Sequence, residues 1–431
     1  MNGVASNFAG LVIPEPDVFR LSGDLEALAD HRDPAEPGWS RILFSDAYSA
    51  GRRFVADLMS DAGLFVSQDD AGNIIGRLSG SGATGAIVTG SHTDTVRGGG
   101  RYDGTVGVIG AIEAVRVLRT AGVQLQHDLC VVDFLGEEPN PWGVSCLGSR
   151  ALAGTLDSSM LEARDQSGKS LAQAMTDSGI NPDSIKGASW KPGDVHAFLE
   201  LHIEQGPVLE RMGVQIGVVT GIVGIVRFVA RFRGQSNHAG TTPMPDRHDA
   251  LCAAAEVIML VEQLARCGNG VATVGRVLVE PGSINVVPGQ TNLWVEVRSI
   301  STQWMEETLQ AVEDGARTAS ARRGVSVEFD GISFEPPTPV PNKIRGMLNA
   351  VAEEIGVRAI EIPSGAEHDA RQLAQIAPIG MIFVPSRGGL SHCAEEWSDP
   401  NQISVGVHVL TCALVALDGI DRSSLNEGVF V

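Results

Sequence analysis

Residues 86–95 read Ala-Ile-Val-Thr-Gly-Ser-His-Thr-Asp-Thr, an apolar run followed at once by side chains that can bind metal. The run predicts a buried strand, with His92 and Asp94 at its carboxyl end. The same pattern recurs at three later points, at Glu137-Glu138, His202 and His392. Imidazoles and carboxylates gathered at the mouth of a sheet are the ligands that a pair of divalent ions requires. The pattern therefore predicts a hydrolytic site with a metal-activated water.

Asp103 and the pair Glu137-Glu138 each admit more than one interpretation. Asp103 stands eleven residues after His92, beyond a glycine-rich bend at residues 98–100 that could return its carboxylate to the same ion. Asp103 alone would also fit the N-cap of the helix expected over residues 105–121. Two adjacent carboxylates after a buried strand repel each other unless a cation or a proton lies between them. In a dinuclear site, one of the pair can bind metal while the other accepts a proton from the bridging water.

The composition is that of a globular α/β enzyme. The chain has 431 residues, of which 43% are hydrophobic and only 5% aromatic, which is enough for two or three domains with cores of their own. A net charge of −20 argues against nucleic acid or an anionic membrane as a partner, because both repel an acidic surface. We find neither a positively charged leader nor an apolar run of membrane-spanning length, so we expect a cytoplasmic protein.

The order of the apolar runs predicts an α/β protein of two domains. Strands alternate with helices up to about residue 210, which indicates a covered and largely parallel sheet. From about residue 216 the order becomes βαββαβ, the ferredoxin-like pattern, and it ends at the proline-rich residues 335–339. The α/β order then resumes with a helix over residues 342–354. We expect a catalytic domain of residues 1–215 and 336–431 with a mixed sheet, and an inserted α+β domain of residues 216–335.

Together these motifs resemble the M20 metallopeptidases, and within them the amidase branch of N-carbamoyl-L-amino-acid hydrolases, allantoate amidohydrolases and β-ureidopropionases. The resemblance covers about residues 20–420 and rests on two segments. One is residues 90–104, and the other is residues 201–207, which read Leu-His-Ile-Glu-Gln-Gly-Pro and separate this branch from ordinary M20 peptidases and deacylases. The resemblance implies a dinuclear metallohydrolase whose inserted domain serves for dimerisation and as a lid.

The resemblance also implies roles for individual residues. Two divalent ions per subunit, which could be Zn, Mn, Co or Ni, would be bound by His92, Asp103, Glu138, His202 and His392, with Asp103 bridging. Glu137 would be the general base. His238, from the neighbouring subunit of a homodimer, and Asn285 would stabilise the oxyanion. The positions that would contact substrate are Gln205, His238, Asn285, Arg298, Gly365 and His368, with Arg298 gripping a carboxylate.

Without the resemblance, several of these residues have a purely structural interpretation. His238 fits a histidine that caps a loop, and Arg298 fits an ion-pair partner of Glu296. The chain also departs from the family at residues 139–143, which read Pro-Asn-Pro-Trp-Gly where the family commonly has a glycine and then an Arg-Phe pair. A second departure is Glu367, whose added carboxylate could favour a cationic substrate or merely cap a loop.

The expected reaction is hydrolysis of the ureido or amide C–N bond of a small carboxylate-bearing molecule, an N-carbamoyl amino acid or an allantoate-like compound. An N-acyl-amino-acid deacylase or dipeptidase of the same family is the alternative. A non-catalytic binding protein with the same fold is a further alternative. Its signature would be the loss of a ligand or of the base, and all of those residues are present.

Overall fold

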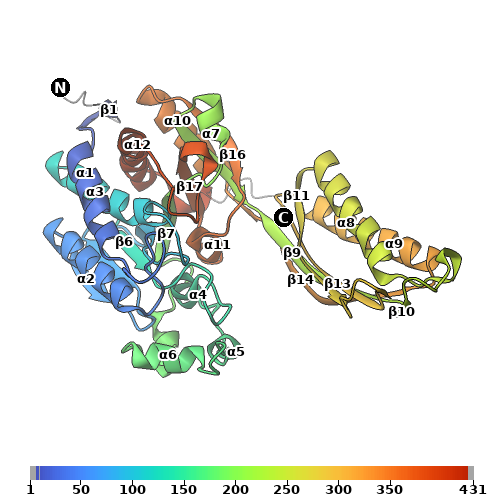
Figure 1. Cartoon of the computed structure of the whole chain (residues 1–431). Helices are drawn as coiled ribbons and strands as arrows, with labels where there is room; N and C mark the ends of the chain where they lie inside the picture. Colours follow the sequence, from blue (N-terminus) through green and yellow to red (C-terminus); the bar gives the residue numbers. More distant parts are fainter. Residues whose placement is uncertain (1–5, 9, 426–431) are drawn as a thin grey trace. The chain divides into compact units, whose positions relative to one another are not determined.

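The computed structural model describes residues 6–8 and 10–425, which form two compact units (Figure 1). The first unit consists of Met1–Thr220 together with Val340–Val431, and the second is Gly221–Pro339. The second unit is thus inserted into the sequence of the first.

The first unit is built on a mixed sheet. Over the described residues its strand order is β15-β8-β17-β7-β5-β6-β4-β3, and β16 also pairs with β8. Four central strands are mutually parallel: β6 (Leu129–Phe134), β5 (Ala86–His92), β7 (Val195–Ile203) and β17 (Ile379–Val384). The other strands are β3 (Phe65–Gln68), β4 (Ile74–Leu78), β8 (Ile216–Ile222), β15 (Thr338–Pro339) and β16 (Ala359–Ser364). The expected mixed α/β sheet is confirmed.

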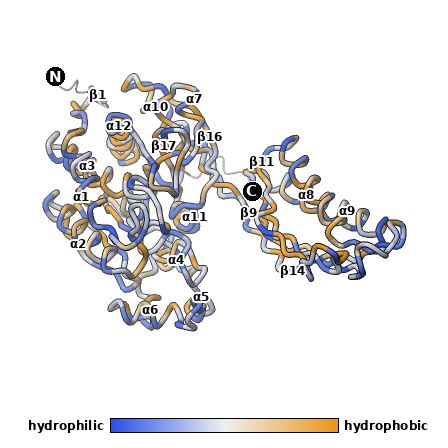
Figure 2. Tube along the Cα trace, viewed as in Figure 1, coloured by the Kyte–Doolittle hydropathy of each residue, from blue (hydrophilic) through white to orange (hydrophobic). Residues whose placement is uncertain are grey.

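The central strands are covered on both faces, so every residue of β5, β6, β7 and β17 is buried. Helices α3 (Thr105–Thr120) and α12 (Pro400–Asp418) pack against each other and against the sheet, and hydrophobic colour follows much of α12 in Figure 2. By length and composition α12 could cross a membrane, contrary to the sequence-based expectation, but 67% of its apolar window is buried. The core helix of a soluble protein passes the same test, so α12 is weak evidence for a membrane.

Local capping sets where the outer helices begin. The side chain of Asp17 accepts hydrogen bonds from the backbone N–H groups of Phe19 and Arg20, so α1 begins at Val18. Ser45 caps the next helix in the same way. The helices outside the core pair are α1 (Val18–Asp30), α2 (Asp46–Asp61), α4 (Leu147–Ala153), α5 (Ser158–Leu161), α6 (Leu171–Asp177), α7 (Val208–Met212), α10 (Asn342–Glu354), α11 (Asp369–Leu373) and α13 (Arg422–Leu425). A hairpin of β1 (Ser6–Phe8) and β2 (Leu11–Ile13) precedes them.

The inserted unit, all of whose residues are described, has an antiparallel sheet of order β11-β13-β9-β14. Its elements follow the chain as β9 (Gly224–Arg233), α8 (Ala250–Cys267), β11 (Gly270–Glu280), β13 (Gln290–Ser299), α9 (Thr302–Arg322) and β14 (Ser326–Glu335). Phe232, Leu293 and Val295 are buried against the two helices, whereas alternate residues of the same strands face away from them. The first β segment of the predicted βαββαβ order is interrupted at Val223, so the chain forms two strands there, β8 and β9.

A buried ion pair ties α2 to the end of β6, just before Glu137. Arg52 Nε lies 2.9 Å from Asp133 Oδ2, and the other guanidinium nitrogens donate to Gly72 O at 2.6 Å and Asp133 O at 2.8 Å. Thr93 Oγ1 donates to the second carboxylate oxygen at 3.0 Å. The arrangement satisfies a charge that would otherwise be costly to bury.

We expect Arg52→Met to lower the free energy of unfolding by about 3–5 kcal/mol, because it leaves the Asp133 carboxylate buried without its cation. The neighbouring Arg53 is exposed, so Arg53→Met is the matched control and should change stability by less than about 0.5 kcal/mol. Chemical denaturation of the two variants measures both values. Equal effects would show that the ion pair has no special role.

Candidate metal centre and active site

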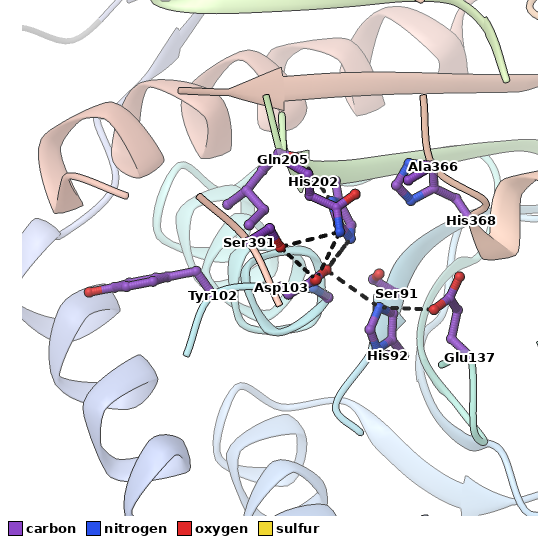
Figure 3. Close-up of polar contacts among 12 residues, drawn as sticks. Ser91, His92, Tyr102, Asp103, Glu137, His202, Gln205, Ala366, His368 and Ser391 are labelled. Atoms are coloured by element: carbon purple, nitrogen blue, oxygen red, sulfur yellow. Dashed lines mark hydrogen bonds and ion pairs between the residues drawn. The ribbon is translucent and has the colours of Figure 1, made fainter. Parts of the chain in front are cut away.

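Asp103 lies at the centre of the candidate site (Figure 3). Its Oδ1 is 3.2 Å from His202 Nε2 and 4.0 Å from His92 Nε2. Its Oδ2 is 3.1 Å from His392 Nε2, which in turn lies 3.5 Å from Glu138 Oε1. The ligand atoms of His92, Asp103 and His202 all lie within 4.8 Å of one another, and so do those of Asp103, Glu138 and His392. The structure therefore brings all five expected ligands together in two groups that share Asp103.

Hydrogen bonds fix which nitrogen of each buried histidine faces Asp103. His92 Nδ1 lies 3.1 Å from the carbonyl oxygen of Asp94, and His202 Nδ1 lies 2.9 Å from the carbonyl oxygen of Ile203. A carbonyl oxygen can only accept, so both Nδ1 atoms carry the proton. Nε2 of each ring therefore faces Asp103: it donates to that carboxylate when the ring is protonated, and in the neutral ring it offers a lone pair for a metal ion.

Gly104 makes room for this arrangement. It is the N-cap of α3 and has φ of 65°, and a Cβ atom there would lie 2.4 Å from the His92 ring. Asp103 precedes the cap, so the interpretation of Asp103 as the helix N-cap is wrong. Its carboxylate is instead free of the helix and available to the histidines.

The carboxylates at the site are buried close together, and burial makes their charged forms less favourable. Burial, reinforced by the Asp103 charge, raises the pKa of Glu138 to about 8. Burial also raises the pKa of Glu137 well above its usual range. Burial alone would raise the pKa of Asp103 too, but hydrogen bonds with His202 and His392 outweigh it and hold that pKa well below the usual value. This excess of buried negative charge, with its imidazole and carboxylate donors, fits divalent cations.

Glu137 belongs to neither ligand group. Its Oε2 lies 3.5 Å from His92 Nε2, and the Cys146 thiol lies 3.7 Å from its Oε1. The backbone N–H groups of Glu137 and Glu138 donate to the two carboxylate oxygens of Asp94 at 3.2 and 3.1 Å. Asp94 therefore holds the end of β6 beside the end of β5.

Two of the expected substrate contacts lie directly at this centre. Gln205, whose φ is 56°, donates from Nε2 to Asp103 Oδ2 at 2.8 Å. The ring of His368 lies 4.5 Å from that of His202, and burial lowers the pKa of His368 well below its usual value. Gly365 lies in the loop between β16 and α11, three residues before His368.

The other three expected contacts lie in the inserted unit. His238, in the short strand β10 (Asn237–His238), pairs with β12 (Val286–Val287), and Ala239 N donates to Asn285 O at 2.9 Å, so His238 and Asn285 are neighbours. His238 Nδ1 accepts from the N–H groups of Gly240 at 3.1 Å and Thr241 at 3.2 Å. The ring thus caps its loop, and its proton is on the exposed Nε2.

Arg298 forms the ion pair that the sequence alone allowed. Its Nε lies 2.7 Å from Glu296 Oε1, while Arg227 Nε lies 2.7 Å from Glu296 Oε2. Two guanidinium groups therefore meet one carboxylate. A cavity of about 530 Å³ lies beside them on the sheet face opposite the helices, and its lining includes Arg276 and Trp294.

Glu367 and residues 139–143, where the sequence departs from the family, contact neighbouring loops. Glu367 Oε1 lies 3.6 Å from Arg150 Nη2, and Ser145 Oγ lies 3.4 Å from Glu367 Oε2, which favours the loop-capping interpretation over recognition of a cationic substrate. Trp142 donates from Nε1 to the carbonyl of Lys169 at 2.9 Å, and its ring packs edge-on against Phe44. Both residues therefore act within the loops around the site.

Sequence reasoning did not identify Glu396. Its side chain is 1% exposed and lies between the loop of Asp103 and the loop of His392. Glu396 stands in a polar segment, Ala394-Glu395-Glu396, in which nothing distinguishes it from its exposed neighbour Glu395.

Comparison with known proteins agrees with this geometry. The family model of peptidase family M20/M25/M40 matches residues 88–416. The chain is 40% identical to an N-carbamoyl-L-amino acid amidohydrolase of Geobacillus stearothermophilus, over 86% of this chain and 92% of the relative. It is 38% identical to a ureidoglycolate hydrolase of Oryza sativa subsp. japonica, over 92% of this chain and 84% of the relative. The crystal structure of a hydantoinase/carbamoylase family amidase from Burkholderia multivorans matches with a TM-score of 0.87 at 34% identity, covering 94% of this chain and 99% of that one. This chain therefore belongs to peptidase family M20/M25/M40.

Proposed function

We propose that this chain is a metal-dependent amidohydrolase that cleaves a C–N bond of a small ureido carboxylate, either an N-carbamoyl amino acid or an allantoate-like molecule. The observation that carries the proposal is the pair of ligand groups sharing Asp103, beside a buried carboxylate, Glu137, that belongs to neither. The relatives named for N-carbamoyl-L-amino acids and ureidoglycolate support the substrate class. Ureidoglycolate is itself a ureido carboxylate and belongs to the same class.

We assign one divalent ion to His92, Asp103 and His202 and a second to Asp103, Glu138 and His392. Zn, Mn, Co and Ni all suit this donor set. When bound, such ions would polarise the scissile carbonyl and acidify a water molecule. The rest of the chemistry belongs to the side chains of this chain.

Glu137 is the general base in this proposal. It accepts the proton of the attacking water and then returns that proton to the leaving nitrogen, which departs as an amine. Glu137 suits both steps because it lies beside the ligand groups without belonging to either, so its carboxylate stays available for the proton. The carbamic acid released from a ureido substrate then breaks down to CO₂ and ammonia.

The inserted unit supplies substrate recognition. Arg227 and Arg298 both contact the carboxylate of Glu296, and a guanidinium such as that of Arg298 can bind a substrate carboxylate through two parallel hydrogen bonds. His238 carries its proton on the exposed Nε2, which suits it to donate a hydrogen bond to the developing oxyanion, with Asn285 beside it. We propose that His238 serves the active site of the partner in a homodimer, since it lies in a different compact unit from the candidate ligands.

The substrate class is tested by ammonia and amine release from allantoate, N-carbamoyl amino acids, ureidoglycolate and N-acetyl amino acids after metal supplementation. Ureido carboxylates should react fastest. Arg298→Ala should lower their kcat/KM by about ten- to a hundredfold, because a charge-assisted bidentate contact is lost. A neutral amide of the same substrate should lose much less, since that contact was never available to it.

Arg227→Ala is the matched control, because Arg227 pairs with the same carboxylate, Glu296. Its effect on the carboxylate substrate should be clearly smaller than that of Arg298→Ala. Equal losses would make Arg298 a structural partner of Glu296 only. Faster hydrolysis of N-acetyl amino acids would instead favour the deacylase, and no turnover of any substrate would favour a binding protein.

Glu137→Gln should reduce turnover by about a hundred- to ten-thousandfold while metal content stays near wild type, because a proton acceptor is lost but no ligand is. Glu138→Gln should lose metal. Elemental analysis of both purified variants after gel filtration separates the two roles. Equal metal depletion in the two proteins would contradict the division between base and ligand.

Mixed dimers test whether His238 acts across subunits. Glu137→Gln and His238→Ala subunits, each inactive alone, should regain activity when mixed, because one site of each heterodimer receives both intact groups. Mixing Glu137→Gln with Glu138→Gln is the control and should restore nothing, since every site then lacks either the proposed base or a proposed metal ligand. If the first pair exchanges subunits yet stays inactive, His238 acts within its own subunit or has no catalytic role.

A further inference from the structure

Glu396 joins two loops that are far apart in the sequence. Its Oε1 accepts the backbone N–H of Tyr102 at 2.8 Å and that of Asp103 at 3.1 Å. Its Oε2 lies 2.8 Å from Ser391 Oγ. Tyr102 and Asp103 lead into α3, whereas Ser391 directly precedes His392. One carboxylate therefore binds the backbone that carries one candidate ligand and the residue next to another.

The surroundings of Glu396 are shaped to hold its carboxylate in this place. The side chain is buried, so the backbone N–H groups that it satisfies have no water to replace it. A Cβ atom at Gly100 would lie 2.2 Å from Glu396 Cδ, so a glycine is needed where the chain passes over the carboxylate. Ser391 Oγ also lies 3.0 Å from Asp103 Oδ2. Through Ser391, Glu396 is thus connected to the oxygen of Asp103 that faces His392.

A second contact joins the same two loops without reaching a ligand. The guanidinium of Arg101 stacks over the ring of Trp397 at 4.9 Å and over that of Trp39 at 4.7 Å. General cohesion of the loops therefore does not depend on Glu396 alone. What Glu396 adds is control of position at Asp103 and Ser391 themselves.

We propose that Glu396 is a positioning residue that sets the placement of Asp103 relative to His392, and so the affinity for the divalent ion that these two residues would share with Glu138. The proposal rests on the proposed metal-dependent function. Without Glu396 the two loops stay joined through Arg101, but Asp103 Oδ2 and His392 Nε2, now 3.1 Å apart, are no longer held in this arrangement. An ion bound by His92 and His202 would be affected less, because these two ligands lie at the ends of β5 and β7 and not in the loops that Glu396 joins.

The experiment is calorimetric titration of the metal-free protein with Co²⁺, with the visible absorption of the bound ion as a second readout. The wild type should take up two equivalents. Glu396→Ala should weaken one of the two binding steps by about 10- to 100-fold, the usual cost of removing a partner of a metal ligand, and leave the other step nearly unchanged. Glu396→Gln should weaken it by less than about tenfold, because the amide can still accept from the two N–H groups and donate to Ser391.

Two further variants control for charge and for folding. Glu395→Ala removes the adjacent exposed carboxylate and should bind Co²⁺ as the wild type does. Gly100→Ala keeps Glu396 but places a methyl group against its carboxylate, and it should weaken the same binding step as Glu396→Ala. If Glu396→Ala does not fold, Gly100→Ala alone tests whether Glu396 controls metal affinity.

The outcomes separate the two proposals. A wild type that takes up no Co²⁺ would overturn the proposed metal-dependent function, and this inference with it. A wild type that binds two ions, together with Glu396→Ala or Gly100→Ala proteins that bind both equally well, would overturn only the role of Glu396. Equal weakening of both steps would also overturn it, since that is the result expected of a residue that merely stabilises the fold.

Discussion

The burial of several carboxylates at one edge of a sheet is the constraint on which the rest of this structure depends. Asp94, Asp103, Glu137 and Glu138 are each less than 10% exposed, and water cannot neutralise them there. Imidazoles from β5, β7 and the loop of His392 lie against the Asp103 carboxylate. Backbone N–H groups donate hydrogen bonds to the Asp94 carboxylate. Parallel strands make this possible, because their carboxyl ends meet at the same edge.

Residues whose position follows from their own strand were predictable from sequence. His92, Glu137, Glu138 and His202 each end or follow an apolar run, and a buried strand fixes where such a residue must lie. The helix over residues 342–354 was likewise predictable to the residue, because its apolar period and its flanking prolines are local signals. The mixed sheet follows from the same alternation of strands and helices.

Features that depend on distant partners could not be predicted in this way. Gln205, His392 and Cys146 have positive φ values of 56°, 57° and 55°, although none is glycine, and such conformations persist only when the surrounding structure imposes them. The hydrogen bond from Tyr102 to Glu396 joins residues that are 294 positions apart in the sequence. The sequence also left Glu367 and Arg298 with two interpretations each. Their ion pairs with Arg150 and Glu296 depend on the tertiary structure.

The two ends of the inserted unit lie side by side, because Thr338 pairs with Ile222 and Pro339 with Gly221 in adjacent antiparallel strands. Every candidate metal ligand lies outside Gly221–Pro339 in the sequence. Because the two ends of the inserted segment are adjacent in space, the segment can be replaced by that of a relative with only two junctions, both in this pair of strands. Sequence changes within Gly221–Pro339 can therefore accumulate without replacing any of the candidate metal ligands.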